Sequence, residues 1–366
     1  MAQLELKSVS KAFGKVRPAD DLSLTVEPGE IVSVFGPYGS GKTVLLLMIA
    51  GMFDPDAGDI LVGGRSIIND APERRGIGMA FQNFALFPHM TARDNIASGL
   101  RAKAAAEVDK RVDAISRLLK IGHVLGHLPR ELSNGQKQRT ALARALIGNP
   151  DVLLLDDPLR NVDAKLRYEM RLELPNLLRR GTAAVLYVTQ DYREAMAIAD
   201  RIAVLVDGRI EQIAPPEEIY AAPASVGVAR LFGDPSINLI ETGTFSEHGA
   251  LYAGVCGAKL RLGPSEGQLP DHPCWLGVRP EDLGISSAGG ENAIPARILA
   301  VTPMHDKAVL LLRLSDGREL LSALPPDAQL GAAGDAVFAR LAPEAGLLFD
   351  WESGLRLALA PRRRAA

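Results

Sequence analysis

The chain has few cysteines and little net charge, and each of these absences argues against a class of binding site. Only two cysteines occur among 366 residues, Cys256 and Cys274. They have neither C-x-x-C spacing nor a nearby cluster of metal-binding residues, so two separate reduced thiols are expected rather than a zinc site. The formal net charge is only −3, so no overall basic field would attract nucleic acid or anionic lipid.

Long apolar runs are also missing. The longest, such as Val44 to Phe53, are shorter than the about 20 residues that a helix needs to cross a bilayer. The N-terminus lacks the basic and then apolar pattern of a signal peptide. These absences predict a protein that stays in the cytoplasm. A hydrophobic content of 47% nevertheless supports sizeable cores, and the length suggests two or three domains.

The most informative stretch matches the phosphate-binding loop pattern G-x-x-x-x-G-K-[ST]. Its residues are Gly36, Pro37, Tyr38, Gly39, Ser40, Gly41, Lys42 and Thr43. An apolar run before it predicts a buried strand, and an apolar run after it predicts a helix. The glycines let backbone N–H groups approach phosphate oxygens, and the helix N-terminus adds partial positive charge. Lys42 is expected to reach the outer phosphates of a nucleotide, and the Thr43 hydroxyl to ligate Mg²⁺.

The order of expected elements indicates an α/β fold in the first part of the chain. Short strand-like runs come first, and a further short strand is expected at 59–62. Buried strands are expected at 30–35, 152–155, 184–188 and 202–206. Helices are expected at 43–51, 101–120, 136–147 and 163–180. Pro175 should kink or interrupt the last helix. Strands that alternate with helices predict a mostly parallel sheet with covered faces.

The character of the sequence changes near residue 233. Beyond it, short strand-like runs alternate with Gly and Pro, at 258–262, 275–278, 296–301, 308–314, 320–323 and 336–341. That spacing predicts small β-barrels or a sandwich. We therefore expect a first domain at 1–235, with a helical subdomain at about 84–150, and a second domain at 236–366. The basic tail at 361–364 is expected to be a solvated end.

Two carboxylates follow the apolar strand at 152–155. The carboxyl end of a parallel strand faces the ligand crevice, so Asp156 is expected to hold Mg²⁺ and its water shell. An acidic residue after a strand is also a common turn former. The phosphate loop upstream favours the metal role.

A second anion-binding pattern precedes the helix at 136–147, and its residues are Ser133, Asn134, Gly135 and Gln136. A hydroxyl, a glycine-containing turn and a helix N-terminus would all face the same side and could together bind an anion. A simple helix cap is the alternative. With this segment the chain resembles the nucleotide-binding subunit of an ATP-binding cassette (ABC) transporter. In that family the segment, usually L-S-G-G-Q, reaches across a dimer to the ATP held by the other subunit.

The resemblance implies roles for further residues. Phe13 occupies the position of an aromatic that stacks on adenine, with a core aromatic as the alternative. Gln82 matches a glutamine that senses Mg²⁺ and the γ-phosphate, and residues 84–95 resemble the surface that receives a membrane subunit. Residues 162–163 resemble the loop that crosses the dimer interface. Gln190 stands where the family has its switch histidine.

The resemblance extends into the C-terminal region. Residues 232–238 and 276–282 resemble the regulatory extension of maltose-type importers, and 336–350 resemble its closing strands. The implied architecture is an α/β P-loop NTPase (ABC ATPase) domain with a helical subdomain, followed by an all-β, OB-like (TOBE-type) regulatory domain. The implied cofactors are ATP and Mg²⁺, and the implied solute is a carbohydrate, polyol or glycerol-type compound.

The implied partners are integral membrane permease subunits and, indirectly, an extracytoplasmic solute-binding protein, with no nucleic acid. The implied location is the cytoplasmic face of the inner (plasma) membrane, where the chain would be peripheral. Each expectation follows from the family and not from the chemistry of a site.

Four residues depart from the family pattern, and all belong to the catalytic apparatus. The general-base glutamate is Asp157, whose shorter side chain would leave an in-line water off the geometry for proton abstraction. The switch histidine is Gln190, an amide that cannot carry positive charge. Asn134 replaces a glycine and is expected to restrict the backbone. Arg160 replaces a small polar residue in the interface loop.

These departures suggest a site that binds ATP through Lys42 but hydrolyses it slowly with Asp157 and Gln190. A second, non-identical ATPase subunit would then supply a competent site, and the two chains would form a heterodimer. Two other interpretations stay open. One is a nucleotide-gated regulatory subunit with little or no hydrolysis. The other is a non-transport member of the superfamily, although such proteins usually carry two cassettes, zinc inserts, coiled-coil arms or basic segments that this sequence does not show.

Overall fold

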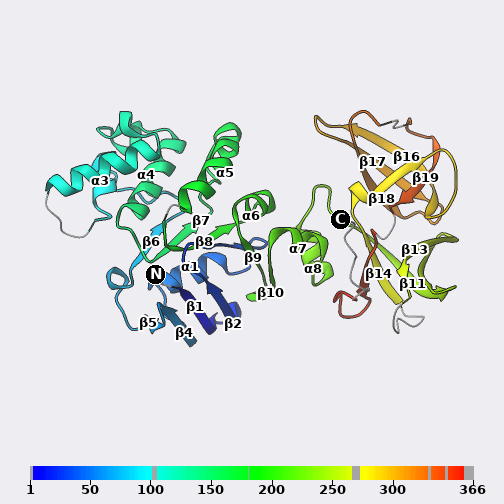
Figure 1. Ribbon diagram of the computed structural model, residues 1–366, viewed down its shortest axis with the longest axis horizontal. Coiled ribbons are helices and arrows are strands. Elements are labelled where there is room, and N and C mark those ends of the chain that lie inside the picture. The colour runs from blue at the N-terminus through cyan, green and yellow to red at the C-terminus, as the bar shows by residue number, and fades with distance from the viewer. Residues whose placement is uncertain are drawn as a thin grey trace. The chain divides into compact units, whose positions relative to one another are not determined.

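The computed structural model describes residues 3–100, 105–179, 181–265, 273–328, 331–342 and 345–357. The chain divides into two compact units, Met1–Ala221 and Ala222–Ala366 (Figure 1). The division falls before the expected boundary at 235/236, so helix α8 (Val226–Leu231) lies with the second unit. The reason is a contact distant in the chain, because the Arg279 guanidinium donates hydrogen bonds to the carbonyls of Ala229 and Phe232.

A six-stranded sheet lies at the centre of the first unit (Figure 1). Its strand order is β10-β9-β3-β8-β7-β6, and all neighbours except β10 and β9 run parallel. The strands are β3 (Ile31–Phe35), β6 (Ile77–Ala80), β7 (Val152–Asp156), β8 (Ala184–Thr189), β9 (Arg201–Val206) and β10 (Arg209–Ala214). The expected mostly parallel sheet is therefore confirmed.

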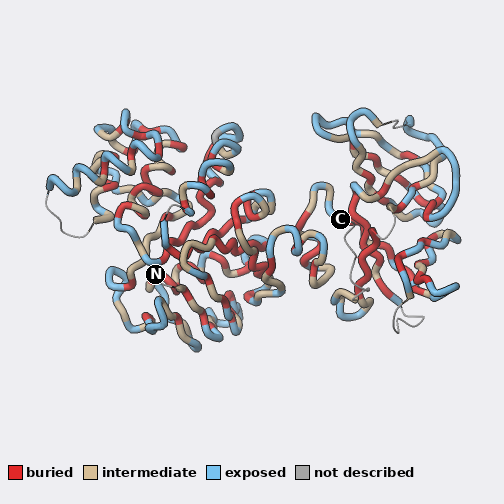
Figure 2. The backbone as a smooth tube through the Cα atoms, viewed as in Figure 1, coloured by how far each residue is buried: buried red, intermediate tan, exposed pale blue. Residues whose placement is uncertain are grey.

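Both faces of this sheet are buried, as the apolar strands predict. Val152 and Leu154 of β7 belong to one hydrophobic core, whereas Leu153 and Leu155 belong to another. This period of two is that of a strand covered on both sides. Figure 2 shows the corresponding band of buried backbone through the first unit.

The first core joins the six-stranded sheet to helix α1 and a second, antiparallel sheet. That sheet has the order β2-β1-β4-β5. The elements concerned are β1 (Leu4–Phe13), β2 (Val16–Val26), α1 (Lys42–Ala50), β4 (Ala57–Val62) and β5 (Arg65–Ser66). Leu45, Leu46, Met48 and Ile49 of α1 are fully buried in this core, which fixes the helix that follows the phosphate loop.

Five helices contribute side chains to the second core. They are α2 (Ala92–Ala97), α3 (Ala105–Leu118), α4 (Asn134–Ile147), α5 (Ala164–Leu178) and α6 (Tyr192–Ile198), and α7 (Pro216–Ala221) follows at the end of the unit. The expected helix at 101–120 thus corresponds to α3, and residues 101–104 lie outside the described residues. None of the described helices is long and apolar enough to cross a membrane.

The expectation that Pro175 interrupts the fifth helix is wrong in part, because α5 continues through it. Pro175 removes one donor from the helix interior, but the next backbone bond, from the Arg179 N–H to the Pro175 carbonyl, measures 3.0 Å. Leu174 and Leu178 are buried in the second core on either side. Tertiary packing therefore holds the helix together where local propensity would break it.

The second unit is an all-β domain with α8 at its start (Figure 1). It contains two five-stranded sheets, β13-β12-β11-β14-β20 and β15-β19-β16-β17-β18. The strands are β11 (Asn238–Glu247), β12 (Ala250–Val255), β13 (Ala258–Pro264), β14 (Pro273–Val278), β15 (Leu283–Ser286), β16 (Ala293–Pro303), β17 (Ala308–Leu314), β18 (Glu319–Leu324), β19 (Ala336–Leu341) and β20 (Leu347–Asp350). One core takes side chains from both sheets. The tail at 361–364 lies outside the described residues.

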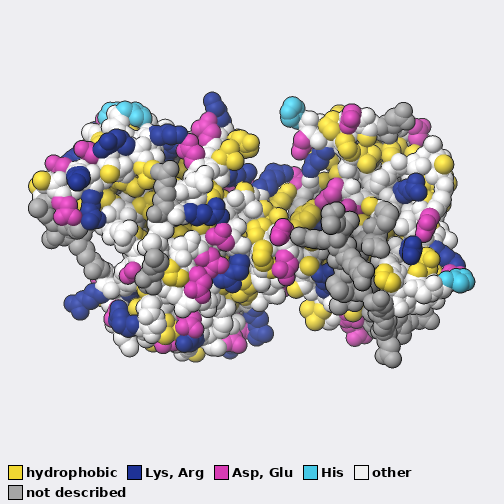
Figure 3. Space-filling model, in the orientation of Figure 1, with side chains coloured by type: hydrophobic (Ala, Val, Ile, Leu, Met, Phe, Trp, Pro, Cys, Tyr) yellow, Lys and Arg dark blue, Asp and Glu magenta, His cyan; other side chains and the backbone are white. Residues whose placement is uncertain are grey.

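Charges of both signs are mixed on the face of the molecule that Figure 3 shows. Lys and Arg alternate with Asp and Glu over the described residues of the face in Figure 3, as the net charge of −3 leads one to expect.

Candidate nucleotide-binding site

The phosphate loop lies between buried strand β3 and helix α1, as the sequence predicts. Two of its glycines are required by close packing. A Cβ at Gly41 would lie 1.8 Å from the carbonyl oxygen of Pro18, and one at Gly36 would lie 2.0 Å from that of Leu205. Gly41 also has a φ of 106°, in the left-handed region that side chains disfavour. The loop conformation therefore depends on these glycines.

Lys42 lies at the centre of the loop. Its ammonium donates to the carbonyls of Gly36 (2.9 Å) and Pro37 (2.7 Å) and to the Ser40 hydroxyl (3.1 Å). The residue is only 5% exposed. Burial lowers the pKa of Lys42, and the carboxylates of Asp157 and Asp156 oppose that change. A buried cation inside a loop of backbone donors suits a polyanion such as a nucleotide phosphate chain.

Two of the residues expected at the Mg²⁺ site, Thr43 and Asp156, lie together. The Thr43 hydroxyl is 3.4 Å from each carboxylate oxygen of Asp156. Burial, and after it the neighbouring Asp157, raises the pKa of Asp156. A bound cation would offset both effects, since it stabilises the charged carboxylate. Hydroxyl and carboxylate oxygens are ligands of the kind that Mg²⁺ prefers, so this donor set fits the ion.

Asp157 lies behind the loop in an unusual conformation. Its φ is 45°, a left-handed value that aspartate tolerates better than most residues. Its N–H donates to the Val188 carbonyl at 2.9 Å, and the residue is 7% exposed. Burial raises the pKa of Asp157, whereas Arg160 opposes this. The Arg160 guanidinium lies 3.6 Å from a carboxylate oxygen of Asp157, a pairing that the sequence did not predict.

Gln190 follows β8, the strand next to β7, so it lies at the same edge of the sheet as Asp157. Its side chain is exposed. Buried polar groups support this strand end, because the Tyr187 and Thr189 hydroxyls donate to Glu194 at 3.0 and 3.1 Å. Burial raises the pKa of Glu194. Sequence reasoning missed this cluster, whose one signal was an acidic residue shortly after the strand.

The second anion-binding pattern forms the start of α4. Ser133 is the N-cap, and its hydroxyl accepts from the Gln136 N–H at 3.3 Å, while the Gln136 side chain accepts from the Ser133 N–H at 2.9 Å. This is a capping box, so the helix-cap alternative is present in the structure. Asn134 and Gly135 belong to the first helical turn and not to a preceding turn.

The expectation that Asn134 restricts the backbone is wrong for this conformation. Asn134 has helical geometry and is not among the residues with positive φ. Any residue adopts that geometry, so a glycine is not needed there. Ser133 and Asn134 are both exposed, which leaves this helix N-terminus open to an approaching anion.

Phe13 ends strand β1 and is 46% exposed, so the alternative of a core aromatic is wrong. Its ring meets that of Phe53 edge-on, with centroids 5.6 Å apart, and the Lys11 ammonium lies 5.6 Å from its centroid. An exposed ring on a fixed strand end is available to stack on a base.

Replacing Phe13 by alanine should weaken the binding of ATP about tenfold, because stacking of a base on an aromatic ring contributes roughly 1–3 kcal/mol. Titration with a fluorescent ATP analogue measures the loss. Inorganic triphosphate serves as the control ligand, since it has phosphates but no base. Equal weakening of both ligands would show that Phe13 supports the loop and does not contact adenine.

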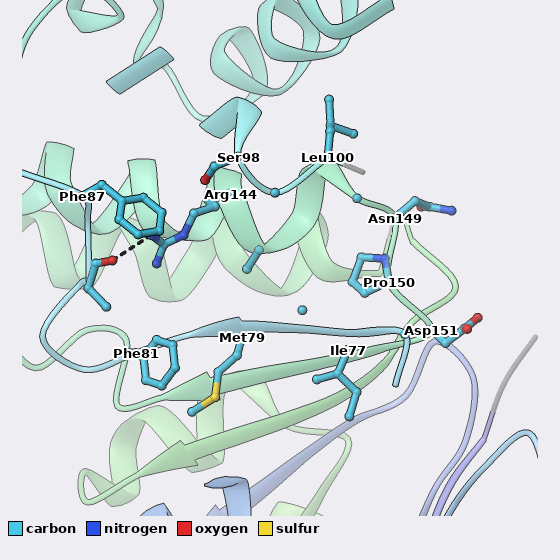
Figure 4. Close-up of a pocket in the computed structure, with 16 residues that line it drawn as sticks. Ile77, Met79, Phe81, Phe87, Ser98, Leu100, Arg144, Asn149, Pro150 and Asp151 are labelled. Atoms are coloured by element: carbon cyan, nitrogen blue, oxygen red, sulfur yellow. Dashed lines mark hydrogen bonds between the residues drawn. The ribbon is translucent and has the colours of Figure 1, made fainter. Parts of the chain in front are cut away.

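The segment after β6 carries Gln82 and lies beside a cleft of about 630 Å³. Gln82 is half-buried, and its carbonyl accepts from the Asn161 side chain at 2.9 Å. Met79, Phe81, Phe87 and Arg144 are among the residues that line the cleft (Figure 4). Of the expected surface at 84–95, Ala85 and Phe87 line the cleft. Arg144 and Ala145 of α4 line it as well, and the sequence did not indicate them because α4 is distant in the chain.

The loop at 36–43, the Thr43–Asp156 pair and the parallel sheet behind them define a P-loop ATPase. A family model described as "ABC transporter" matches residues 19–160, and one described as "TOBE domain" matches residues 276–349. These matches fall on the expected ATPase and regulatory regions.

Relatives match almost the whole chain. It is 40% identical to the xylose/arabinose import ATP-binding protein XacJ of Haloferax volcanii, over 97% of this chain and 95% of the relative. It is 41% identical to the sn-glycerol-3-phosphate import ATP-binding protein UgpC of Cereibacter sphaeroides, over 98% and 100%.

A solved ATP-binding cassette, a dimer in a post-hydrolysis state bound to ADP and Pi, is 31% identical with a TM-score of 0.53. The match covers 58% of this chain and 98% of that one. The chain therefore belongs to the ATP-binding subunits of ABC transporters.

Proposed function

We propose that this subunit lies at the cytoplasmic face of the plasma membrane. There it uses ATP to drive the import of a carbohydrate, polyol or glycerol-type solute. The observation that carries the ATPase role is the buried Lys42 ammonium in a glycine loop, beside Thr43 and Asp156. The solute class rests on the relatives, whose names give xylose/arabinose import and sn-glycerol-3-phosphate import.

In this proposal the site residues divide by the part of MgATP that they contact. Phe13 stacks on adenine, and the backbone of Gly36 to Thr43 surrounds the phosphates together with the Lys42 ammonium. Thr43 and Asp156 hold Mg²⁺ directly or through water, and Gln82 completes this set. When bound, Mg²⁺ supplies neutralisation of phosphate charge. Ser133 to Gln136 contribute their helix N-terminus to the nucleotide of an opposing subunit.

The site of this chain is proposed to turn over slowly. The side chain of Asp157 is one methylene shorter than that of glutamate. A carboxylate oxygen of Asp157 lies 3.6 Å from the Arg160 guanidinium. That pairing directs a carboxylate oxygen toward a cation, where a general base needs it to face the attacking water. Gln190 can donate a hydrogen bond to a phosphate but brings no charge. Binding groups are thus intact, whereas the groups that activate water are altered.

A slow site is tolerable when a second ATPase supplies the competent one. We therefore propose a heterodimer in which Ser133 to Gln136 of this chain complete the site of a non-identical subunit. The dimeric state of the solved cassette supports pairing of such domains. The loop at 84–95 and the adjoining cleft provide the surface for a permease subunit, and a solute-binding protein would deliver the solute from the other side of the membrane.

The test is the composition of the intact transporter. Affinity purification through a tag on this chain, followed by native mass spectrometry, should find one copy with a different ATPase and permease subunits. Two copies of this chain in a complex with full ATP turnover would contradict both the heterodimer and the slow site. Uptake of labelled xylose, arabinose, glycerol and glycerol 3-phosphate into cells lacking this chain then identifies the solute, which should lose its ATP-dependent uptake.

A further inference from the structure

The segment between β6 and α2 contains two adjacent residues in a conformation that neither favours. Phe84 has a φ of 64° and Ala85 a φ of 46°. Residues with a Cβ rarely adopt left-handed geometry, and two in succession persist only where surrounding groups hold them. Their own backbone bonds are turn bonds, from the Phe84 N–H to the Phe81 carbonyl and from the Ala85 N–H to that of Asn83. The holding groups must come from elsewhere in the fold.

Arg144 of helix α4 holds both residues. Its guanidinium donates to the Ala85 carbonyl at 2.7 Å and to the Phe84 carbonyl at 3.2 Å. The same group lies 5.6 Å from the centroid of the Phe87 ring, and Figure 4 shows the two side by side at the cleft. Burial lowers the pKa of Arg144. A planar fork with several donors is suited to bridge adjacent carbonyls in this way.

A second side chain holds the far end of the segment. Asn95 of α2 is fully buried, and its oxygen accepts from the Phe87 N–H at 2.7 Å. Its amide donates to the carbonyls of Phe87, Met90 and Thr91 at 3.0–3.1 Å. Residues from Phe87 onward are therefore attached to the helical part of the first unit, whereas Gln82 lies two residues after the end of β6 in the central sheet. Phe84 and Ala85 form the joint between these two parts.

Helix α4 connects this joint to the opposite end of the subdomain. Its first turn follows Ser133, and Arg144 lies in its last turn. Arg144 lies eleven positions after Ser133, or about 16 Å along the helix at about 1.5 Å per residue. Packed helices can shift as units, so we expect a displacement at Ser133 to be carried to Arg144.

We propose that Arg144 is a positioning residue that fastens the left-handed joint at Phe84–Ala85 to helix α4. Displacement of α4 relative to the sheet then moves the segment that carries Gln82 at one end and faces the cleft at the other. The joint thus links the helix behind Ser133 to Gln82 and to the permease surface, a linkage that rests on the roles given to them in the proposed function. This inference does not depend on whether the chain's own site is fast or slow.

Hydrogen exchange of the full chain tests whether Arg144 holds Phe84 and Ala85 in place. Arg144→Met removes the donors and keeps an apolar side chain, so amides of 84–87 should exchange about tenfold faster while α1 is unaffected. Arg139→Met is the matched control, since Arg139 lies on the same helix and donates to the Leu119 carbonyl at 3.1 Å. Equal exchange at 84–87 in the two variants would overturn the proposal, as would a rise in exchange spread over the whole first unit.

Glycine at the joint provides the second test. Ala85→Gly removes the Cβ that opposes left-handed geometry, so adding it to Arg144→Met should bring exchange at 84–87 back toward the native rate. A purely structural role for Arg144 in packing α4 predicts no such rescue. Failure of the double variant to recover protection would therefore count against the joint.

The coupling between ATP hydrolysis and solute uptake is measured in the assembled transporter. Arg144→Met should leave the KM for ATP within about twofold, because it does not touch the phosphate loop, but lower solute uptake per ATP hydrolysed about fivefold or more. Ala85→Gly in the same background should recover part of that ratio. An unchanged ratio of uptake to hydrolysis would refute the coupling role, and it would leave the ATPase assignment untouched.

Discussion

Replacing Lys42 by alanine is expected to lower ATP turnover about 100-fold or more and to weaken the binding of ATP. The ammonium donates to three loop acceptors within 3.1 Å. When ATP binds, its phosphate oxygens would replace those acceptors as partners of the ammonium. No other lysine or arginine of the described residues takes this position in the loop. Titration with a fluorescent nucleotide and a phosphate-release assay measure the two losses.

The control for Lys42→Ala is Lys120→Ala. Lys120 is exposed and pairs with Glu173 on the surface, so its removal should change neither quantity. The melting temperature of the Lys42 variant should not fall by more than a few degrees, because burial lowers the pKa of Lys42 and thus disfavours its charged form in the fold. A variant that binds ATP as tightly as the native chain would contradict the assignment of the loop.

The phosphate loop could be predicted from sequence because its determinants are contiguous. Gly36 to Thr43, the apolar strand before them and the apolar helix after them specify one another within about 20 residues. The Asp156 position followed from the same reasoning, since a parallel sheet brings the carboxyl ends of its strands to one edge. Such features need no knowledge of distant contacts.

Other features depended on contacts between distant parts of the chain. Propensity predicts a break at Pro175, but burial of its neighbours in the second core keeps α5 continuous. The division between the two compact units falls before α8 because α8 bonds to Arg279, about 50 positions further on. Arg144 gave no signal in the sequence, since its partners at 84–85 become visible only when α4 packs beside them.

Asn134 shows the opposite case, in which a family departure has less structural effect than its residue type suggests. Glycine is required only where φ is positive or the backbone approaches closely. Asn134 does not have a positive φ, because it begins a helix capped by Ser133. The slow-site proposal therefore rests on the residues at the strand ends, Asp157 and Gln190, together with Arg160.

Restoring both strand-end residues, as Asp157→Glu with Gln190→His, is expected to raise ATP turnover tenfold or more if chemistry limits the rate, since a positioned base contributes about 10²–10⁴-fold. The longer carboxylate would reach past the Arg160 guanidinium that now lies 3.6 Å from Asp157. Adding Arg160→Ser should increase turnover further, because it frees that carboxylate. Phosphate release by the full chain and by the assembled transporter measures the rates.

Asp109→Glu, an equal lengthening on the exposed surface of α3, is the control and should leave turnover unchanged. The restored variant should melt at a somewhat lower temperature than the native chain, because glutamate tolerates the left-handed φ of 45° at position 157 less well than aspartate. Loss of stability together with a gain in rate is the combination expected when a residue is chosen for fold compatibility at the expense of catalysis. If turnover stays unchanged while the affinity for ATP is retained, the altered carboxylate and amide do not limit hydrolysis, and the slow-site proposal is wrong.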